Sequence, residues 1–340
     1  AGAGGEDAPD GKAAAAHPPF SFLWRYIGAW NGNVTWDRYA LVDAYLAEQA
    51  PAVVDLPLGT QVRHVATEKM RLFPGQDAAF VPDEPLLWAS LGFATGLLEG
   101  GHVQLLEGEM PTARGPGEAV DVLIRKTAET LGLQVGEQYI LMTPDLGQIA
   151  VRIAGVWQAA DEAADAWFYE PSSFDEVLLT SEDAFVSQVV PALQAPVATA
   201  VWYQVYDGSR VRPASVNGLL ASVATVEARV TALLANTTLD VSPVAALQSY
   251  GRAASLLALL LTVFSLPVLG LVVYFISLIA GMVVRREQSE IAVMRGRGIT
   301  RGKIVTLYLL EGLLVGGVGL AGGLPLGRFM AQVMSRTRSF

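Results

Sequence analysis

Residues 253–284 read AASLLALLLTVFSLPVLGLVVYFISLIAGMVV and contain no Asp, Glu, Lys or Arg. The hydrocarbon core of a bilayer needs about 20 apolar residues in a helix. A helix over this run would be about 48 Å long, which exceeds a core of roughly 30 Å. We therefore expect a transmembrane helix that tilts, kinks at Pro267 or continues outside the bilayer. The alternative, a buried core helix, is disfavoured because such helices are rarely so uniformly apolar.

A second apolar run, residues 304–326, reads IVTLYLLEGLLVGGVGLAGGLPL and predicts another span. Its single charge, Glu311, has two open interpretations: a functional intramembrane carboxylate, or a group that pairs with a loop Arg or caps backbone near the interface. Small residues let membrane helices approach closely, so a glycine stripe indicates a packing face for a helix of this chain or of another copy. The stripe consists of Gly312, Gly316, Gly319 and Gly323.

The connection between the two runs, residues 285–303, is basic and glycine-punctuated: RREQSEIAVMRGRGITRGK. Short loops rich in Lys and Arg stay in the cytoplasm, so everything before residue 253 is expected outside. A weaker basic cluster after the second run opposes this orientation. We expect a short helix from Arg286 to about Arg295, ended by glycine, with Thr300 capping the next helix. The loop cations are Arg285, Arg286, Arg295, Arg297, Arg301 and Lys303.

Charge divides the chain into two parts with different surroundings. The formal net charge is −10, yet residues from 281 onward hold nine basic and three acidic side chains. All seven Trp residues lie at or before Trp202, and there is no Cys, hence no disulfide framework. The acidic upstream part argues against nucleic-acid binding, which favours a basic surface.

Catalytic and metal-binding motifs are not found in the sequence. The three histidines, His17, His64 and His102, lack ligand spacing and are expected to be surface or structural residues. The stretch GRGITRGK fails as a phosphate loop, because Arg297 stands where the first glycine is required and Ile304 replaces Ser/Thr. We therefore expect no enzyme, no metal site and no cofactor bound by this chain. An acidic loop at Asp161, Glu162 and Asp165 is expected to be solvated rather than metal-binding.

The upstream part alternates short apolar runs with turn signals, which predicts a mixed α+β domain. Residues 36–49 have helical periodicity. Residues 102–111 predict a strand followed by a turn, residues 118–143 predict a strand, a helix, a glycine turn and a second strand, and residues 149–158 predict a further strand. Residues 216–234 predict an amphipathic helix of about five turns. Packing against the domain's own sheet is favoured over sealing a partner subunit. Residues 244–256 can run helically into the first span.

The stretch EIAVMRGRGITRGKIVTLYLLEGLLVGGVGLAGG resembles the signature of FtsX-like permeases, the transmembrane subunits of the MacB/LolC class of ABC transporters. Matching positions are Glu290, Ile291, Ala292, Met294, Arg295 and Gly298 in the loop and Glu311 in the span. The resemblance covers roughly residues 250–330. Residues from about 105 to 157 more weakly resemble the MacB-like periplasmic core domain. The family has four spans, so this chain is expected to be a piece of a longer protein.

The resemblance implies a transmembrane permease subunit of a type VII ABC transporter, in which a separate ATPase subunit carries ATP and Mg. The residues implied in ATPase coupling are Arg286, Glu290, Ile291, Met294, Arg295 and Arg297. The alternatives are an FtsX-like regulator of an outer enzyme such as a cell-wall hydrolase, or a non-energised membrane-anchored scaffold.

The expected location is the bacterial inner membrane. Expected partners are an ABC ATPase, a second permease copy or homologue, an extracytoplasmic substrate or adaptor, and membrane lipid. The domain organisation expected is: 1–250 an extracytoplasmic MacB-like α+β domain, 251–284 a transmembrane helix with stalk, 285–303 a cytoplasmic coupling loop with a coupling helix, 304–327 a transmembrane helix, and 328–340 an extracytoplasmic tail.

Overall fold

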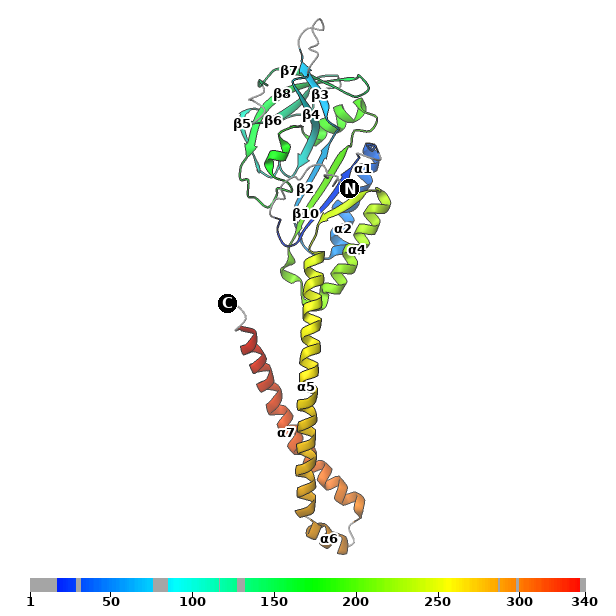
Figure 1. The fold of residues 1–340 in the computed structure, drawn as a ribbon, viewed down its shortest axis with the longest axis vertical. Coiled ribbons are helices and arrows are strands. Elements are labelled where there is room, and N and C mark those ends of the chain that lie inside the picture. Colours follow the sequence, from blue (N-terminus) through cyan, green and yellow to red (C-terminus); the bar gives the residue numbers. More distant parts are fainter. Residues whose placement is uncertain are drawn as a thin grey trace, which may run out of the picture. The chain divides into compact units, whose positions relative to one another are not determined.

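The structure is a computed structural model of the 340-residue chain (Figure 1). It divides into two units, residues 1–254 and residues 255–340, which are described separately below. The division lies close to the predicted boundary at residue 250. The residues that the structure describes are 17–28, 32–75, 85–115, 117–126, 132–286, 288–297 and 300–336.

The described part of unit 1 is built on an 11-stranded sheet in the order β11-β1-β10-β2-β4-β3-β7-β8-β6-β9, with β5 paired to β8. The strands expected from the sequence around residues 103–158 are confirmed as β5, β6, β7 and β8. The helix expected between β6 and β7 falls largely outside the described residues. The strand bounds are β1 Ser21–Ile27, β2 Leu58–Ala66, β3 Met70–Pro74, β4 Leu87–Thr95, β5 Val103–Gly108, β6 Val120–Arg125, β7 Gln138–Met142, β8 Gln148–Ala159, β9 Val177–Leu179, β10 Thr199–Tyr206 and β11 Thr237–Val241.

Six of these strands form a closed ring of pairings. Strand β4 pairs antiparallel with β3 and parallel with β9, and the chain of neighbours β3-β7-β8-β6-β9 returns to β4. Each ring strand contributes a buried apolar side chain to the same cluster, so the ring encloses packed side chains rather than a channel. These residues are Leu72, Leu91, Val122, Leu141, Val151 and Leu178.

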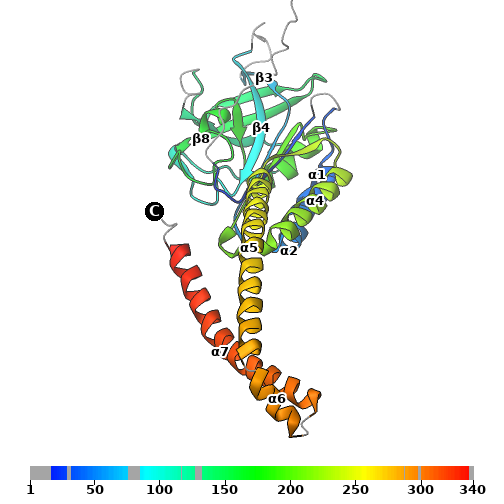
Figure 2. The same cartoon turned by 60° about the horizontal axis from the view of Figure 1, so that its bottom comes forward.

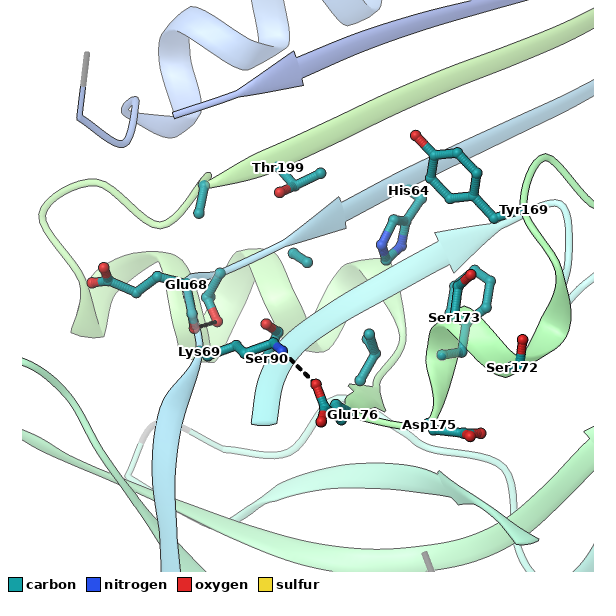
Figure 3. A pocket seen from close by; sticks show the side chains of 15 residues that line it. His64, Glu68, Lys69, Ser90, Tyr169, Ser172, Ser173, Asp175, Glu176 and Thr199 are labelled. Atoms are coloured by element: carbon teal, nitrogen blue, oxygen red, sulfur yellow. Dashed lines mark hydrogen bonds and ion pairs between the residues drawn. The ribbon is translucent and has the colours of Figure 1, made fainter. Parts of the chain in front are cut away.

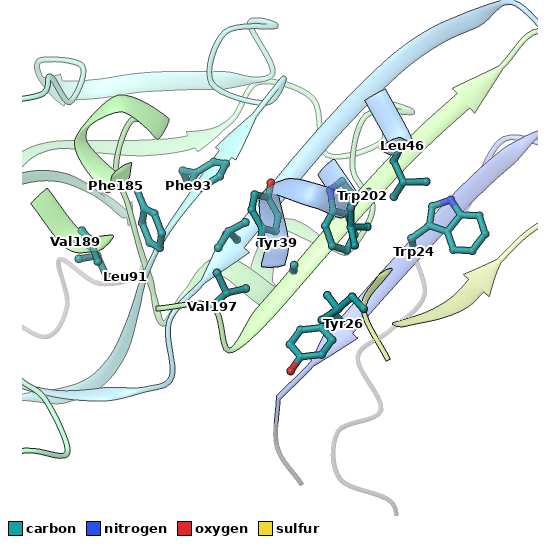
Figure 4. Close-up of a cluster of buried hydrophobic side chains, with 14 of the residues drawn as sticks. Trp24, Tyr26, Tyr39, Leu46, Leu91, Phe93, Phe185, Val189, Val197 and Trp202 are labelled. Carbon is teal, nitrogen blue, oxygen red and sulfur yellow. The ribbon is translucent and has the colours of Figure 1, made fainter. Parts of the chain in front are cut away.

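A helical layer packs against the open half of the sheet (Figure 2). It contains α1 (Trp36–Ala44), a π-helical turn η1 (Tyr45–Gln49), α2 (Ala50–Val54) and α4 (Val216–Leu233). Helix α4 confirms the predicted amphipathic helix, and its apolar face packs within its own domain. The ring of Tyr39 on α1 stacks on Trp202 of β10 at 5.3 Å, inside the cluster drawn in Figure 4. The buried residues of α4 are Val216, Leu219, Val223, Val226 and Val230.

The other face of the sheet is covered by the segment that follows β8. Trp157 and Trp167 lie parallel with ring centroids 6.1 Å apart, and Phe174 meets both edge-on. These rings join Phe168 and Tyr203 in a second buried cluster. Short elements complete unit 1: η3 (Pro171–Phe174), α3 (Glu182–Ala184), η4 (Phe185–Val189), η5 (Val190–Ala192), η6 (Gly208–Arg210) and η7 (Pro213–Ser215).

An ionic network fixes the helical layer to the sheet. Arg63 on β2 donates to Asp43 of α1 (2.8 Å) and to Glu182 of α3 (2.7 Å). The indole nitrogen of Trp202 also donates to Asp43 (2.9 Å). Burial disfavours the charged form of Arg63, but the nearby carboxylates of Asp43 and Glu182 outweigh this and raise its pKa.

A second network fixes the ring. Asp121 on β6, whose side chain is 1% exposed, accepts from Arg152 of β8 at 2.7 Å and forms an ion pair with Arg114 at 2.9 Å. Burial alone would raise the pKa of Asp121, but the hydrogen bonds from Arg152 and Arg114 outweigh it and lower that pKa. The charged carboxylate is therefore favoured by folding.

We predict that Asp121→Ala lowers the free energy of unfolding of unit 1 by about 2–3 kcal/mol at neutral pH, since two partly buried guanidinium groups lose their counter-charge. Because the pKa is lowered on folding, this contribution is fully present above the ordinary value of 3.8 and is lost as pH falls below it. Urea titrations followed by tryptophan fluorescence, at neutral pH and at a pH below 3.8, measure the free energy of unfolding. Asp145→Ala, at an exposed turn, is the control and should change stability little. Equal stability of the two variants at neutral pH would contradict the role of Asp121 as the stabilising counter-charge of Arg152 and Arg114.

Candidate membrane and coupling site

Helix α5 (Val244–Arg286) contains the first apolar run and extends it in both directions. The sequence favours a helix here because Leu and Ala are strong helix formers and no charge interrupts the run. The helix continues through Pro267. Its apolar side chains are open to the surroundings: Phe264 is 73% exposed and Leu266 is 70% exposed. The predicted helical continuation from residue 244 into the span is confirmed.

Helix α7 (Arg301–Arg336) contains the second apolar run. Leu313 is 78% exposed and Val318 is 73% exposed. The helix passes through Pro325 and ends later than the predicted span boundary at residue 327. Part of the segment expected as a tail, residues 328–336, is therefore helical.

These two helices are long and apolar enough to cross a membrane, and the structure leaves their apolar windows almost entirely uncovered. Among the described residues, neither run is buried as a core helix would be. Hydroxyl groups on the helices are satisfied by their own backbone: Thr262 donates to Ala258 O and Thr306 to Gly302 O, each at 2.8 Å. The exposed Thr225 of α4 makes the same bond to Ala221 O (2.8 Å), so such bonds are compatible with a bilayer but are not specific to it. The length, apolar composition and exposure of the two helices are those of a membrane protein.

A short helix, α6 (Gln288–Gly296), connects the two long ones, and its existence confirms the predicted loop helix. It begins later than predicted, because Arg286 is the last residue of α5. The N–H of Arg297 donates to Val293 O (3.1 Å) and closes the last turn. Helix α7 then begins directly after Thr300, whose carbonyl accepts from the N–H of Lys303 (3.0 Å). The position predicted for its N-cap is confirmed.

The residues predicted for coupling lie within or beside α6. Met294 is half-buried on this helix, whereas Arg297 is exposed in the turn after it. Ile304, in the first turn of α7, is buried, and the sequence analysis gave it no role beyond the span. Glu290, Ile291 and Arg295 belong to α6 by their backbone, but their side chains, like the whole of Gly298, lie outside the described residues. Their role in coupling stays a prediction.

The glycine stripe of α7 faces open space. A Cβ placed on any of its members would meet no other atom within 4 Å, so no described helix of this chain packs against it. Both partners considered for this face, a further helix of the same protein and a helix of another copy, therefore stay predictions. The members, Gly312, Gly316, Gly319 and Gly323, all lie in α7.

Glu311 is exposed on α7, and within the described residues it takes part in no ion pair. The interpretation that it pairs with a loop arginine therefore has no support from the described side chains, although Arg301 is not among them. Pro267 is inside α5, and Figure 1 draws that helix as one continuous element. A kink at this proline stays a prediction.

The three histidines and the acidic loop lie in unit 1. His64 is buried, and its Nδ1 lies 2.7 Å from the carbonyl oxygen of Phe93, as expected of a structural histidine. Asp161 accepts from the N–H of Ala163 (2.9 Å) in a local turn. The sequence analysis missed a polar crevice beside His64, since its lining comes from segments far apart in the chain.

Comparison with known proteins gives one family and one solved structure of note. Residues 253–340, about a quarter of the chain, match the FtsX-like permease C-terminal domain. A solved domain of a candidate permease protein from Porphyromonas gingivalis is similar to this chain, with 13% identity over 62% of this chain and 86% of that one. Its TM-score is 0.31, which is too low to support an argument about fold. No curated protein matches.

We predict that Leu266→Arg raises the free energy of membrane insertion of α5 by about 2.5–3.5 kcal/mol, because the charge would sit near the middle of the apolar run. Tyr250→Arg, on the same helix but before that run, should cost far less. An insertion assay that scores the membrane-integrated fraction of each variant measures both. Equal shifts for the two variants would show that residues 253–284 do not lie in hydrocarbon.

Proposed function

The chain carries the C-terminal domain of FtsX-like permeases, and from this premise we propose that it is a permease subunit of an ABC-type transporter, of the type VII class. The observation that carries the proposal is the extent of the match. It begins at residue 253 and takes in the charge-free run, α6 and α7 together. The two long helices and the short helix between them therefore act as one functional module. FtsX-like permeases generally work with an ABC ATPase.

In this proposal α6 is the coupling helix on which the ATPase subunit docks. It is nine residues long and sits between two helices that need hydrocarbon around them, so it lies at the membrane surface. ATP and Mg bind to the partner, and this chain performs no hydrolysis. The basic residues of the connection, Arg285, Arg286 and Arg297 among them, give the helix a charged surface that an ATPase with acidic side chains could recognise.

The proposed orientation follows from the distribution of charge. Cytoplasmic loops are enriched in Lys and Arg, and residues 285–303 are the densest basic stretch of this chain. Unit 1, which holds most of the acidic residues, then lies outside the cytoplasm. We propose the inner membrane of a bacterial cell as the location and an extracytoplasmic substrate or adaptor as the ligand of unit 1. The resemblance of unit 1 to the MacB-like core domain stays a prediction.

Helix α5 is the proposed mechanical link. Its 43 residues correspond to about 65 Å at 1.5 Å per residue, roughly twice the thickness of a bilayer core. Near its start, Leu247 is 8% exposed and belongs to the main apolar cluster of unit 1. A displacement of α6 can therefore pass along one continuous helix to a side chain that is packed inside unit 1.

A second permease copy is the proposed partner of α7. Close helix association in a membrane depends on small residues that let backbones approach. The open glycine stripe of α7 provides such a surface, and nothing among the described residues occupies it.

We predict that Arg295→Glu lowers the amount of ATPase that co-purifies with the chain by about tenfold or more, since reversal of one interfacial charge costs at least ~1.4 kcal/mol. Arg252→Glu makes the same change of charge near the start of α5, at the end of that helix away from α6, and should not change the amount of ATPase recovered. ATP hydrolysis by the purified complex measures the outcome, and tryptophan fluorescence verifies that unit 1 remains folded. Wild-type ATPase recovery with Arg295→Glu would disprove docking through α6.

The orientation has its own test, because the chain contains no Cys and a single introduced thiol is therefore unique. We predict that a membrane-impermeant maleimide labels Ser187→Cys on intact cells but labels Ser289→Cys only after the cells are permeabilised. Both serines are exposed, so neither is shielded by folding. The reverse pattern would place α6 outside and remove the basis for ATPase coupling.

A further inference from the structure

Unit 1 contains a crevice of about 730 Å³ on the face of the sheet that carries the second aromatic cluster (Figure 3). Its floor is formed by His64 of β2, Ser90 of β4 and Thr199 of β10. The segment around η3 forms the opposite wall, from which Tyr169 and Ser173 face the strands. The volume is within the range of roughly 300–1,000 Å³ that is usual for small-molecule sites.

The crevice lies beside the end of the β2–β4 pairing. The pairing of β2 with β4 ends at Ala66 opposite Gly92, and residues 67–69 then lead into β3. On β4, the N–H of Ser90 instead donates to Glu176 O (2.9 Å), which belongs to the opposite wall. The crevice is therefore bordered by the end of β2, by β4 and by the segment that leads from η3 into β9, which pairs with β4.

The floor of the crevice is held rigidly. The ring of His64 lies between Phe168 and Phe174, with centroid distances of 5.6 and 5.2 Å. Its Nδ1 is 2.7 Å from the Phe93 carbonyl oxygen, so that nitrogen donates and the imidazole is oriented by the backbone. A site whose walls are already ordered loses little entropy when a ligand binds.

The charges of the lining are compensated within the protein. Lys69 pairs with Glu176 across the rim, and Asp175 pairs with Arg125. The lining's single cation is thus neutralised, which disfavours an anionic ligand such as a phosphate. Glu68 is an exposed rim residue, so no uncompensated carboxylate lies deep in the crevice to hold an amine. A charged ligand of either sign is therefore a poor match.

The uncharged part of the lining is rich in hydroxyl groups with aromatic rings beside them. Hydroxyl groups both donate and accept, and they suit a ligand that does the same. Burial raises the pKa of the Tyr169 phenol, which therefore stays neutral. A lipid chain would need apolar walls, whereas this lining is largely polar. The hydroxyl-bearing residues are Thr67, Ser90, Tyr169, Ser172, Ser173 and Thr199.

We propose that this crevice is a binding site for a neutral, hydroxyl-rich ligand, namely a short saccharide. Ser90 and Thr199 on the strands and Ser173 on the wall supply hydrogen bonds to the ligand's hydroxyl groups, and the ring of Tyr169 offers a flat surface to the carbon-bound hydrogens of a sugar ring. The inference rests on unit 1 alone, so it goes beyond the permease function and holds independently of ATPase coupling.

The test uses the full chain in phospholipid nanodiscs, which avoids detergents with sugar headgroups. Maltotriose, cellotriose and chitotriose are the probes, with spermidine as the cationic and inorganic phosphate as the anionic comparison, and isothermal titration calorimetry is the measurement. Ser173→Trp fills the crevice, and Thr199→Val removes one hydroxyl group with little change of shape. Ser187→Trp, at an exposed serine outside the crevice, is the matched control.

At least one trisaccharide should bind. Ser173→Trp should weaken binding by tenfold or more, and Thr199→Val by about threefold to tenfold, as expected for one lost hydrogen bond. The control should bind as the wild type does. Should none of the three sugars bind, should binding survive Ser173→Trp, or should spermidine or phosphate alone bind the crevice, the saccharide assignment is wrong. Thr199→Val keeps the test valid if Ser173→Trp disturbs folding.

Discussion

The structure depends on one requirement: the apolar side chains of α5 and α7 must be surrounded by apolar material that the described residues do not supply. Water cannot fill that role, since exposed apolar surface of this extent is strongly unfavourable. A bilayer satisfies the requirement. It also explains why basic residues gather where the apolar runs end.

The membrane part was largely predictable because its signals are local in sequence. Composition alone placed both long helices, and glycine with threonine placed the break around α6. The errors lie at helix ends, where propensity is a weak guide. Helix α7 continues past residue 327 to Arg336, and Arg286, predicted to begin the coupling helix, is the last residue of α5. The role of the coupling residues could not be read in this way, because docking depends on a partner that is separate from the chain.

Unit 1 was predictable in its parts and not in its assembly. The apolar spacing of residues 216–234 identified α4 and its buried face, and alternation identified several strands. Closure of the ring was not foreseeable, because β9 has only three residues and pairs in parallel with a strand far away in sequence. The crevice was not predicted from the sequence for the same reason. Its floor and wall come from β2, β4, β10 and the η3 segment, and no short motif joins them.

An uninterrupted α5 also constrains how the protein can evolve. Each residue of an α-helix turns the chain by about 100° and advances it by about 1.5 Å. A single insertion between Leu247 and the end of the apolar run would therefore rotate one end of the helix against the other by more than a quarter turn. Under the mechanical role proposed for α5, changes of length would be tolerable only in steps near a whole number of turns. For the mechanical link proposed above, the number of residues in α5 therefore matters as well as their amino-acid composition.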